Sequence, residues 1–450
     1  MEVVIGKNIT IHYPTEKIRK YCEEKLILSN PAYEKKVKMG FWVGNTPEQL
    51  RLYAEGQNKI IVPFGCAEDI FALEKHFLWK TIFSPFKAIS FLGSINLYDY
   101  QQKALKRLLW AKSGVLEAPC GSGKTRIGIA LIKEIGGKAL WLTHTHSLLK
   151  QSEESARSLL PSATFSETTE GKVDFSGDIT FATVQTLSKI DPSFYENEFS
   201  VVIVDEAHHC VGTPTQVTQF YHVLCNCNCR YKYGLTATPK RADGLTKSMF
   251  ACLGKIQHKI TEREVGEKII KAKHIVVPIE LEYDILSYSS GDGMMDYGKL
   301  SNMLAMHAER NALIVEKTES LYNERKGQQL LLCHRISQVK ELAKLLRSRG
   351  EDVSEIYGET PKAQRNYKAD FIVATYALAK EGLDIPTLDC VHFCAPIKDE
   401  ITIVQSAGRV ERNYKGKITP LVLDYVDVNI PYCLGALRKR KQILKKVCTI

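Results

Sequence analysis

A glycine-rich run from Ala118 to Thr125, with the sequence APCGSGKT, most constrains what this chain can fold into. The apolar segment before it predicts a short strand, and Thr125 to Ile135 predicts the helix that follows. A glycine-rich turn between a buried strand and a helix presents backbone N–H groups to phosphate oxygens at the helix N-terminus. The run therefore predicts an α/β domain with a phosphate-binding loop.

The residues of this loop have the chemistry that nucleotide phosphates need. Gly121, Ser122 and Gly123 would bring backbone N–H groups close to the phosphates, because glycine adds no side chain. Lys124 would reach the β- and γ-phosphates, and Thr125 would ligate Mg²⁺. The alternative is a glycine-rich turn without a ligand, and the predicted strand and helix on either side disfavour it.

Two acids follow another predicted strand. Val201 to Asp205 reads as a buried strand, and Glu206 comes next. In a nucleotide site Asp205 can hold the Mg²⁺ shell together with Thr125, while Glu206 can orient or deprotonate a water. Two acids after a strand can also simply begin a helix. Their place in the same predicted sheet as the phosphate loop favours the catalytic interpretation.

The strand and helix pattern occurs twice. A chain of 450 residues is longer than one hydrophobic core usually supports. We expect a small α+β accessory domain over residues 1–90 and two parallel-sheet domains over 91–260 and 261–450, with the boundary near Lys255 to Lys273. The expected strands are 138–143, 179–184, 201–205 and 231–236, then 329–334, 354–357, 371–376, 390–395 and 421–425.

Composition limits the class of protein. Lys and Arg exceed Asp and Glu by 61 − 51 = 10, a weak sign of a polyanionic partner. The 13 cysteines lack the dense spacing of a disulfide framework, and we find no secretory signal or apolar run that would span a membrane. We therefore expect a cytoplasmic protein with reduced thiols and no membrane partner. Cys225, Cys227 and Cys229 alternate, unlike zinc ligand pairs, so buried thiols are favoured over a metal site.

The motifs between Leu97 and Asp427 resemble the superfamily 2 helicases. The resemblance implies two tandem RecA-like domains that hydrolyse ATP with Mg²⁺. It makes Gln101 the adenine contact and the segment from Thr236 to Pro239 the link between hydrolysis and strand movement. It also implies contacts to a nucleic-acid backbone from five residues: Thr143, His144, Thr183, Gln185 and Thr375.

The second half of the resemblance lies near the end of the chain. Gly382, Asp384 and Gln405 match residues that bind nucleotide in the family. Arg409 and Arg412 match the arginines that stabilise charge in the transition state. A solvated helix face, or a salt bridge to a local acid such as Glu411, is the alternative for these two arginines.

The run GLTATPKRADG, residues 234–244, resembles the XPB-like group within that superfamily, which includes tailed-phage branch-migration helicases of the UvsW type. This implies an enzyme of bacteriophage layout that acts on double-stranded or branched DNA in replication and recombination. An RNA helicase or a transcription-linked duplex DNA translocase is the first alternative. A nucleic-acid binding or annealing module with incidental ATPase activity is the second.

The N-terminal residues carry one suggestive group. Phe41 and Trp42 follow Lys35, Lys36 and Lys38, which is compatible with a patch that stacks on bases. Partly buried rings at the edge of a domain are the favoured alternative. We also expect residues 1–90 to form an accessory DNA-binding domain. A chain beginning near residue 91 should therefore keep some ATPase activity and lose any preference for branched DNA.

Two other features of the sequence have ordinary structural explanations. Trp110 and Trp141 have spacing compatible with core positions. The basic run from Arg438 to Lys441 fits either a solvated helix face or a contact with DNA phosphates.

Overall fold

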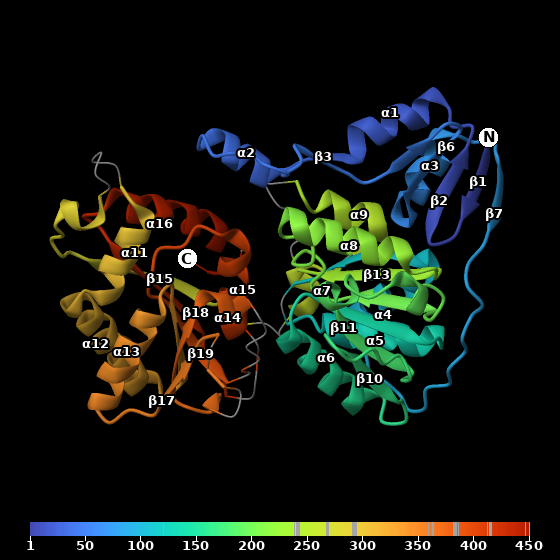
Figure 1. The fold of residues 1–450 in the computed structure, drawn as a ribbon. Coiled ribbons are helices and arrows are strands. Elements are labelled where there is room, and N and C mark those ends of the chain that lie inside the picture. The colour runs from blue at the N-terminus through green and yellow to red at the C-terminus, as the bar shows by residue number, and fades with distance from the viewer. Residues whose placement is uncertain are drawn as a thin grey trace. The chain divides into compact units, whose positions relative to one another are not determined.

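The chain forms two compact units, Met1–Glu264 and Val265–Ile450 (Figure 1). The computed structural model describes all residues except 120, 238, 240–243, 267–269, 290–294, 359, 362–363, 381–384, 386, 412, 414–415, 446 and 450, and except the side chains of 285, 379, 380 and 401. Each unit contains a parallel sheet, and the first also carries a mixed sheet. The expected α/β fold with two parallel sheets and a small N-terminal α+β part is confirmed.

The N-terminal part is a five-stranded mixed sheet in the order β5-β6-β2-β1-β7. Buried and half-buried positions alternate along β1 and β2, as expected for strands with one face on a core. The elements are β1 (Glu2–Ile5), β2 (Asn8–His12), α1 (Glu16–Lys25), β3 (Ile27–Ser29), α2 (Pro31–Lys38), β4 (Gln49–Arg51), β5 (Ala54–Gly56), β6 (Lys59–Pro63), η1 (Phe64–Cys66), α3 (Ala67–Leu73) and β7 (Leu78–Thr81).

The first parallel sheet has seven strands in the order β10-β11-β9-β12-β13-β8-β14. Every position of β9, β11 and β12 is buried, because helices cover a parallel sheet on both faces. The elements are α4 (Asp99–Ala111), β8 (Ser113–Glu117), α5 (Lys124–Ile135), β9 (Ala139–Thr143), α6 (His146–Leu159), β10 (Phe165–Thr168), β11 (Ile179–Thr183), α7 (Val184–Leu187), η2 (Pro192–Phe194), β12 (Val201–Val204), α8 (Pro214–Asn226), β13 (Tyr231–Thr236), α9 (Lys247–Leu253), β14 (Ile256–Lys259) and α10 (Glu262–Val265).

The second unit has a six-stranded parallel sheet in the order β15-β20-β19-β16-β18-β17. Its α13 buries Val339, Leu342, Ala343 and Leu346, the helical stripe that the sequence predicts. The elements are β15 (Lys273–Ile279), η4 (Ile285–Tyr288), α11 (Tyr297–Met306), α12 (Ala308–Arg325), β16 (Gln328–Cys333), α13 (Ile336–Ser348), β17 (Val353–Ile356), β18 (Phe371–Thr375), α14 (Tyr376–Lys380), β19 (Leu388–Phe393), α15 (Glu400–Val410), β20 (Leu421–Asp427) and α16 (Pro431–Leu444).

The N-terminal sheet and the first parallel sheet share one hydrophobic core, which runs from Val3 through to Leu253. At their junction Lys232 is fully buried, and its Nζ donates to the carbonyls of Lys7 at 3.1 Å and Leu224 at 2.9 Å. Its ammonium also lies 5.1 Å from the centre of the Phe64 ring. The N-terminal part is therefore an integral layer of the first unit.

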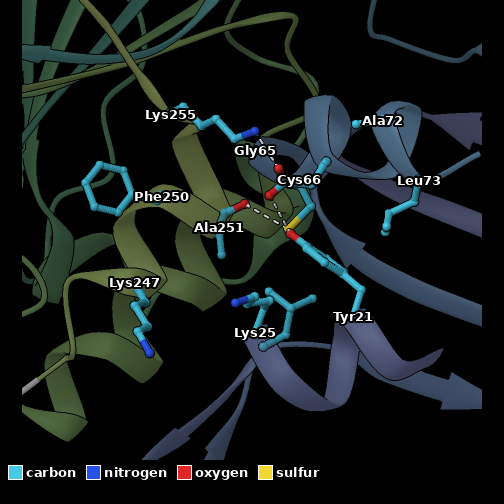
Figure 2. Close-up of a pocket in the computed structure, with 12 residues that line it drawn as sticks. Tyr21, Lys25, Gly65, Cys66, Ala72, Leu73, Lys247, Phe250, Ala251 and Lys255 are labelled. Carbon is cyan, nitrogen blue, oxygen red and sulfur yellow. Dashed lines mark hydrogen bonds and ion pairs between the residues drawn. The ribbon is translucent and has the colours of Figure 1, made fainter. Parts of the chain in front are cut away.

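A pocket of about 470 Å³ lies along this junction (Figure 2). It is lined by residues of α1, η1, α3 and α9, and Lys255 reaches across it to pair with Asp69 at 2.5 Å. The thiol of Cys66 lies 3.7 Å from the carbonyl of Ala251, so η1 packs closely on the end of α9. The pocket contains none of the phosphate-loop residues.

Buried ion pairs tie the helices of the second unit to β20. Arg310 of α12 makes a two-pronged contact with Asp427, at 2.8 and 3.0 Å. Arg440 of α16 pairs with Asp424 at 2.7 Å and is only 1% exposed. Arg440 is therefore part of neither a solvated helix face nor a contact with DNA phosphates, because its guanidinium is buried in an ion pair inside the fold.

The cysteine thiols of the described residues lie in the core, as the sequence favours. The twelve cysteines that the structure describes are all free and buried, and burial raises the pKa of the Cys229 thiol to about 11. Among the described residues, no three or more His, Cys, Asp or Glu side chains are grouped to hold a metal ion. None of the helices in the described part of the chain has the length and apolar character to span a membrane.

Candidate active site

The phosphate loop joins β8 to the first turn of α5, as the sequence predicts. Gly121 and Gly123 have φ angles of 77° and 79°, in the left-handed region that glycine adopts without strain. A Cβ atom on Gly123 would lie 2.4 Å from Nε2 of Gln101, so the loop also needs glycine there for space. Cys120 lies outside the described residues.

Gln101 braces this loop from α4. Its Nε2 donates to the carbonyl of Ser122 at 2.8 Å, and its Oε1 accepts from the backbone N–H of Tyr98 at 3.0 Å. The hydroxyl of Tyr100 donates to the same Ser122 carbonyl at 3.2 Å. The Gln101 amide therefore links the loop to the start of α4. The motif alone did not reveal this role. Its contact with adenine stays a prediction.

The acids at the end of β12 meet the loop at the carboxyl edge of the sheet. Lys124 is 8% exposed, and its Nζ lies 3.4 Å from Oε1 of Glu206. The Thr125 hydroxyl donates to Oδ2 of Asp205 at 3.3 Å, and Oδ1 of Asp205 accepts from the backbone N–H of Glu206 at 2.9 Å. The structure therefore brings together the four side chains that the sequence assigned to phosphate, metal and water.

The two acids are in different electrostatic environments. Burial raises the pKa of Asp205, and the negative charge of Glu206 adds to this. Burial also acts to raise the pKa of Glu206, but Lys124 and His209 more than offset it, so that its pKa is lowered. Glu206 therefore stays ionised at neutral pH, as a group that accepts a proton or orients a water must be.

The backbone at Glu206 is unusual. Its φ is 45°, one of four positive values among the described non-glycine residues. Such a conformation is costly for a residue with a side chain and is found disproportionately at functional sites. The strained backbone turns the carboxylate toward Lys124 immediately after the strand ends.

A chain of polar contacts leads from Glu206 to β13. The Nδ1 atom of His208 lies 3.5 Å from Oε2 of Glu206 and 2.7 Å from the hydroxyl of Thr236. His208 and Thr236 are both fully buried. The segment beginning at Thr236 is therefore linked to the Glu206 carboxylate through one imidazole. Thr238 lies outside the described residues.

Stacked histidines extend this chain to the loop after β9. The rings of His208 and His209 are 4.1 Å apart, and those of His209 and His144 are 4.5 Å apart and stacked. Sequence reasoning assigned His144 to nucleic acid and gave His209 no role. The doubled histidine after Asp205-Glu206-Ala207 was the only signal for it.

The other residues expected to contact nucleic acid on the first unit lie at the ends of strands. Thr143 is fully buried and its hydroxyl donates to the carbonyl of Thr145 at 2.9 Å. Thr183 caps α7 by accepting from the backbone N–H of Thr186 at 3.1 Å, and Gln185 lies in that helix. Both threonines shape loops at the same edge of the sheet as the phosphate loop, and their contacts with nucleic acid stay predictions.

The second unit carries the remaining expected residues. Thr375 ends β18 and is 9% exposed, while Gln405 and Arg409 lie on α15, with Arg409 in its last turn. Gly382, Asp384 and Arg412 lie outside the described residues. Their nucleotide roles, and the approach of Arg409 to phosphate, stay predictions.

The first unit fits ATP with Mg²⁺. Its left-handed glycines leave room for phosphates beside backbone N–H groups, and the buried Lys124 lies next to them. The Thr125 hydroxyl and the Asp205 carboxylate are hard oxygen donors, which Mg²⁺ prefers. When bound, the metal ion supplies charge neutralisation for the phosphates.

Comparison with known proteins gives one matched region in each of the two units. Residues 94–241 match the family described as type III restriction enzyme, res subunit, and residues 313–414 match the helicase conserved C-terminal domain. The chain belongs to the superfamily 2 helicases. Both matched regions fall on the parallel-sheet parts of the two units, so the two RecA-like domains of this helicase are accounted for.

Curated relatives of the helicase include viral and archaeal proteins. It is 28% identical over 324 residues to "Probable helicase D10" of Escherichia phage T5, covering 69% of this chain and 67% of the relative. It is 24% identical over 379 residues to "DNA 3'-5' translocase XPB2" of Sulfurisphaera tokodaii, covering 73% of this chain and 81% of the relative. The helicase spans about two thirds of the length of the first of these.

Solved structures share the fold. Yeast Dbp5, in a complex with RNA and ADP BeF3, superposes with a TM-score of 0.56 at 14% identity, over 78% of this chain and 88% of its own. T4 UvsW aligns over 100% of this chain and 98% of its own at 18% identity, with a TM-score of 0.44 that is too low to support a conclusion. The likeness to Dbp5 agrees with the expected fold of two RecA-like domains.

Proposed function

We propose that this helicase uses ATP hydrolysis to move on DNA and to remodel branched DNA, by branch migration or by unwinding forks and junctions. The observation that carries the proposal is the chain of contacts from Glu206 through His208 to Thr236 and His144. It connects the acid that would act on water with two loops expected to touch a polynucleotide. A relative named as a DNA translocase supports DNA as the substrate.

The geometry suggests how the residues divide the work. Lys124 would hold the phosphates, with Thr125 and Asp205 supplying the oxygen ligands for Mg²⁺. Glu206, kept ionised by Lys124, would orient the attacking water and accept its proton. Arg409 and Arg412, with Gln405, Gly382 and Asp384, would complete the site from the second unit and stabilise charge in the transition state.

The structural change that follows hydrolysis would be transmitted to Thr236 through His208. Loss of the γ-phosphate changes the charge beside Lys124 and Glu206, and Glu206 lies next to the imidazole that contacts Thr236. Because His208 and Thr236 are buried and packed, a shift at one end moves the other. The loops that carry Thr143, His144, Thr183 and Gln185, with Thr375 on the second unit, would then change their hold on the backbone.

The test compares polynucleotides as activators of ATP hydrolysis by the full chain. We expect forked and four-way DNA to stimulate hydrolysis more than linear duplex, and RNA of the same sequence to stimulate it weakly. Equal or stronger stimulation by RNA would replace this proposal with an RNA helicase. Stimulation by linear duplex alone would favour a transcription-linked translocase.

A further inference from the structure

One segment of the N-terminal part stands apart from its sheet. We call residues 27–51 the arm: β3 and β4 form its base, and α2 with the loop 39–48 forms its tip (Figure 1). The two strands of the base pair with each other as a separate two-stranded sheet. No residue of α2 is buried. The base joins the shared core through Leu28 and Leu50, whereas α2 adds no buried residue to it, so the sequence of the tip is free to serve another purpose.

The tip of the arm exposes large apolar side chains. Trp42 is 86% exposed, Phe41 60%, Val37 55% and Met39 52%. These four residues are neighbours in the chain, whereas exposed apolar residues on a surface are usually scattered singly. The favoured sequence expectation, that Phe41 and Trp42 are partly buried at an edge, is therefore wrong.

Hydrogen bonds brace the loop that carries these rings. Lys36 donates from its Nζ to the hydroxyl of Thr46 at 2.7 Å, and the backbone N–H of Phe41 donates to the carbonyl of Lys36 at 2.8 Å. Asn30 donates to the carbonyl of Pro47 at 2.6 Å and closes the base of the loop. The exposed rings are therefore presented on a braced support, which lowers the entropy lost when they bind.

Gly44 fixes the Trp42 indole itself. Its φ is 53°, and a Cβ atom at this position would lie 3.0 Å from the indole ring. The ring therefore lies close to the backbone of Gly44 and is otherwise largely open to solvent. An aromatic ring that is largely open to solvent can stack on a flat ligand.

The charge of the arm indicates which flat ligand it would take. Residues 27–51 contain four Lys or Arg and two Glu, a net charge of 4 − 2 = +2. Lys35 and Lys38 are exposed in the last turn of α2, directly before the aromatic tip. Exposed lysines beside open aromatic faces are the combination that binds unpaired nucleotides, through phosphates and stacked bases respectively.

We propose that the arm contacts DNA at the branch point, with Trp42 stacked on an unpaired base and Lys35 and Lys38 on the neighbouring phosphates. This inference rests on the proposed function, because only a branched or opened duplex offers an unpaired base beside a duplex. It adds a second site of contact, on the N-terminal part, to the loops of the parallel-sheet domains.

The test uses a forked DNA with 2-aminopurine at the first unpaired position, and the full chain without nucleotide. Stacking of Trp42 quenches the probe, so we expect Trp42→Ala to lose the quenching and to bind the fork about tenfold more weakly. Trp42→Phe keeps a ring and should retain most of both signals. The matched control is Trp110→Ala, which removes a 72% exposed tryptophan elsewhere on the same unit.

The lysines are tested by salt. Lys35→Ala with Lys38→Ala should weaken binding to forked and single-stranded DNA alike, and should reduce the slope of log affinity against log salt by about two. ATP hydrolysis at saturating single-stranded DNA should be unchanged in these variants, because none of the substituted residues lies near the phosphate loop.

The outcomes separate this inference from the proposed function. Quenching and fork affinity that are the same in Trp42→Ala as in Trp110→Ala would overturn the arm contact, whatever the wild type does to forks. A Trp42→Ala chain that changes its solution mass but not its DNA binding would also overturn it and make the tip a protein contact. Quenching through Trp42 by a wild type that never remodels forks would uphold the contact and contradict the proposed function.

Discussion

Glu206 is the residue that, under the proposed function, acts on the attacking water. The strained backbone at φ 45°, the nearby ammonium of Lys124 and the contact with His208 all act on the same carboxylate. The ionised form is favoured because Lys124 and His209 lower its pKa against the effect of burial. The side chain is thus held in the charge state and direction that activation of a water requires.

The first prediction removes only the charge of this group. Glu206→Gln should keep the fold and the binding of nucleotide but lower kcat for ATP hydrolysis by about 10²- to 10⁴-fold, since a positioned base contributes on that order. Steady-state hydrolysis and binding of a fluorescent nucleotide measure the two effects. Glu154→Gln, at an exposed position on α6, is the control. A Glu206→Gln chain with normal kcat would remove Glu206 from the mechanism.

The second prediction concerns transmission through Thr236. Thr236→Val keeps the shape of the buried side chain but deletes the hydroxyl that lies 2.7 Å from His208. We expect hydrolysis to be retained within about tenfold, while the number of base pairs opened per ATP falls sharply. Thr218→Val, on the exposed side of α8, is the control. If the ratio of unwinding to hydrolysis stayed normal, coupling would run through other contacts.

The grouping of the candidate site residues was predictable from sequence where a motif fixes the spacing. Lys124, Thr125, Asp205 and Glu206 are set by the ends of two strands, and the structure brings them together. The bracing of Ser122 by Gln101, and the position of His209 between two other rings, depend on packing between elements far apart in the chain. Spacing along a sequence does not report such contacts.

At the scale of elements, the N-terminal sheet is tied to the first parallel sheet by η1 and α9. Gly65 of η1 packs so closely that a Cβ atom would lie 2.3 Å from the backbone nitrogen of Gly254. Cys66, Cys225 and Cys252 belong to the single core that covers both parts. Deleting residues 1–90 would uncover this core. We therefore no longer expect a chain beginning near residue 91 to keep activity, because it would lose stability first.

The third prediction tests the packing at this junction by adding one methyl group to Gly65. Gly65→Ala should destabilise the first unit by about 1–3 kcal/mol, because backbone atoms of Phe250 and Gly254 cannot move aside cheaply. Gly56→Ala is the matched control, since its Cβ would meet only the flexible Lys59 side chain at 3.4 Å. Urea denaturation measures both. Equal stability of the two variants would mean that the layers are not packed as described.

His392 of β19 makes the second unit sensitive to acid. It is fully buried between the Tyr425 hydroxyl at 3.1 Å and the Gln329 side chain at 2.8 Å, and burial lowers its pKa to about 3. Its folded pKa lies below the usual value of about 6.5, so the unfolded chain binds the proton more tightly. The stability it contributes is complete above about pH 6.5 and is lost as the pH falls toward 3.

The fourth prediction follows from that sign. Between pH 7.5 and pH 5 the second unit should lose about 2 kcal/mol of unfolding free energy through His392, and His392→Gln should abolish this part of the loss. Urea denaturation at the two pH values gives the difference. His334→Gln, at an exposed position after β16, is the control and should keep the wild-type pH dependence. If His392→Gln lost as much unfolding free energy between these pH values as the wild type, other groups would be responsible for the loss.

The elements themselves were largely predictable, and the misplaced residues share a cause. Continuous apolar runs identify the buried strands, and β13 was predicted with its observed bounds, Tyr231–Thr236. Trp141 is buried as expected, but Trp110 is 72% exposed beneath the guanidinium of Arg107, 4.4 Å from the ring centre. Arg440 was expected at the surface and is buried. The exposure of Trp110 and of Arg440 depends on which face of its helix packs on the sheet. A single aromatic or basic residue does not determine that face.

At the scale of the molecule, the residues assigned to chemistry are shared between the two units. The first carries the phosphate loop, the acids and the histidine chain, and the second carries α15 with Gln405 and Arg409. Neither set is complete for catalysed hydrolysis as proposed, because the transition-state arginines and the water-orienting acid are on different units. Under the proposed function, hydrolysis therefore needs residues of both units.

The fifth prediction, and the most direct test of this account, is conversion of a labelled DNA fork or four-way junction to its separated or migrated products. With ATP the wild type should convert it, whereas a non-hydrolysable ATP analogue, or the Lys124→Ala variant with ATP, should leave the DNA bound but unchanged. Equal conversion with the analogue would contradict the account and leave a binding or annealing protein whose ATPase is incidental.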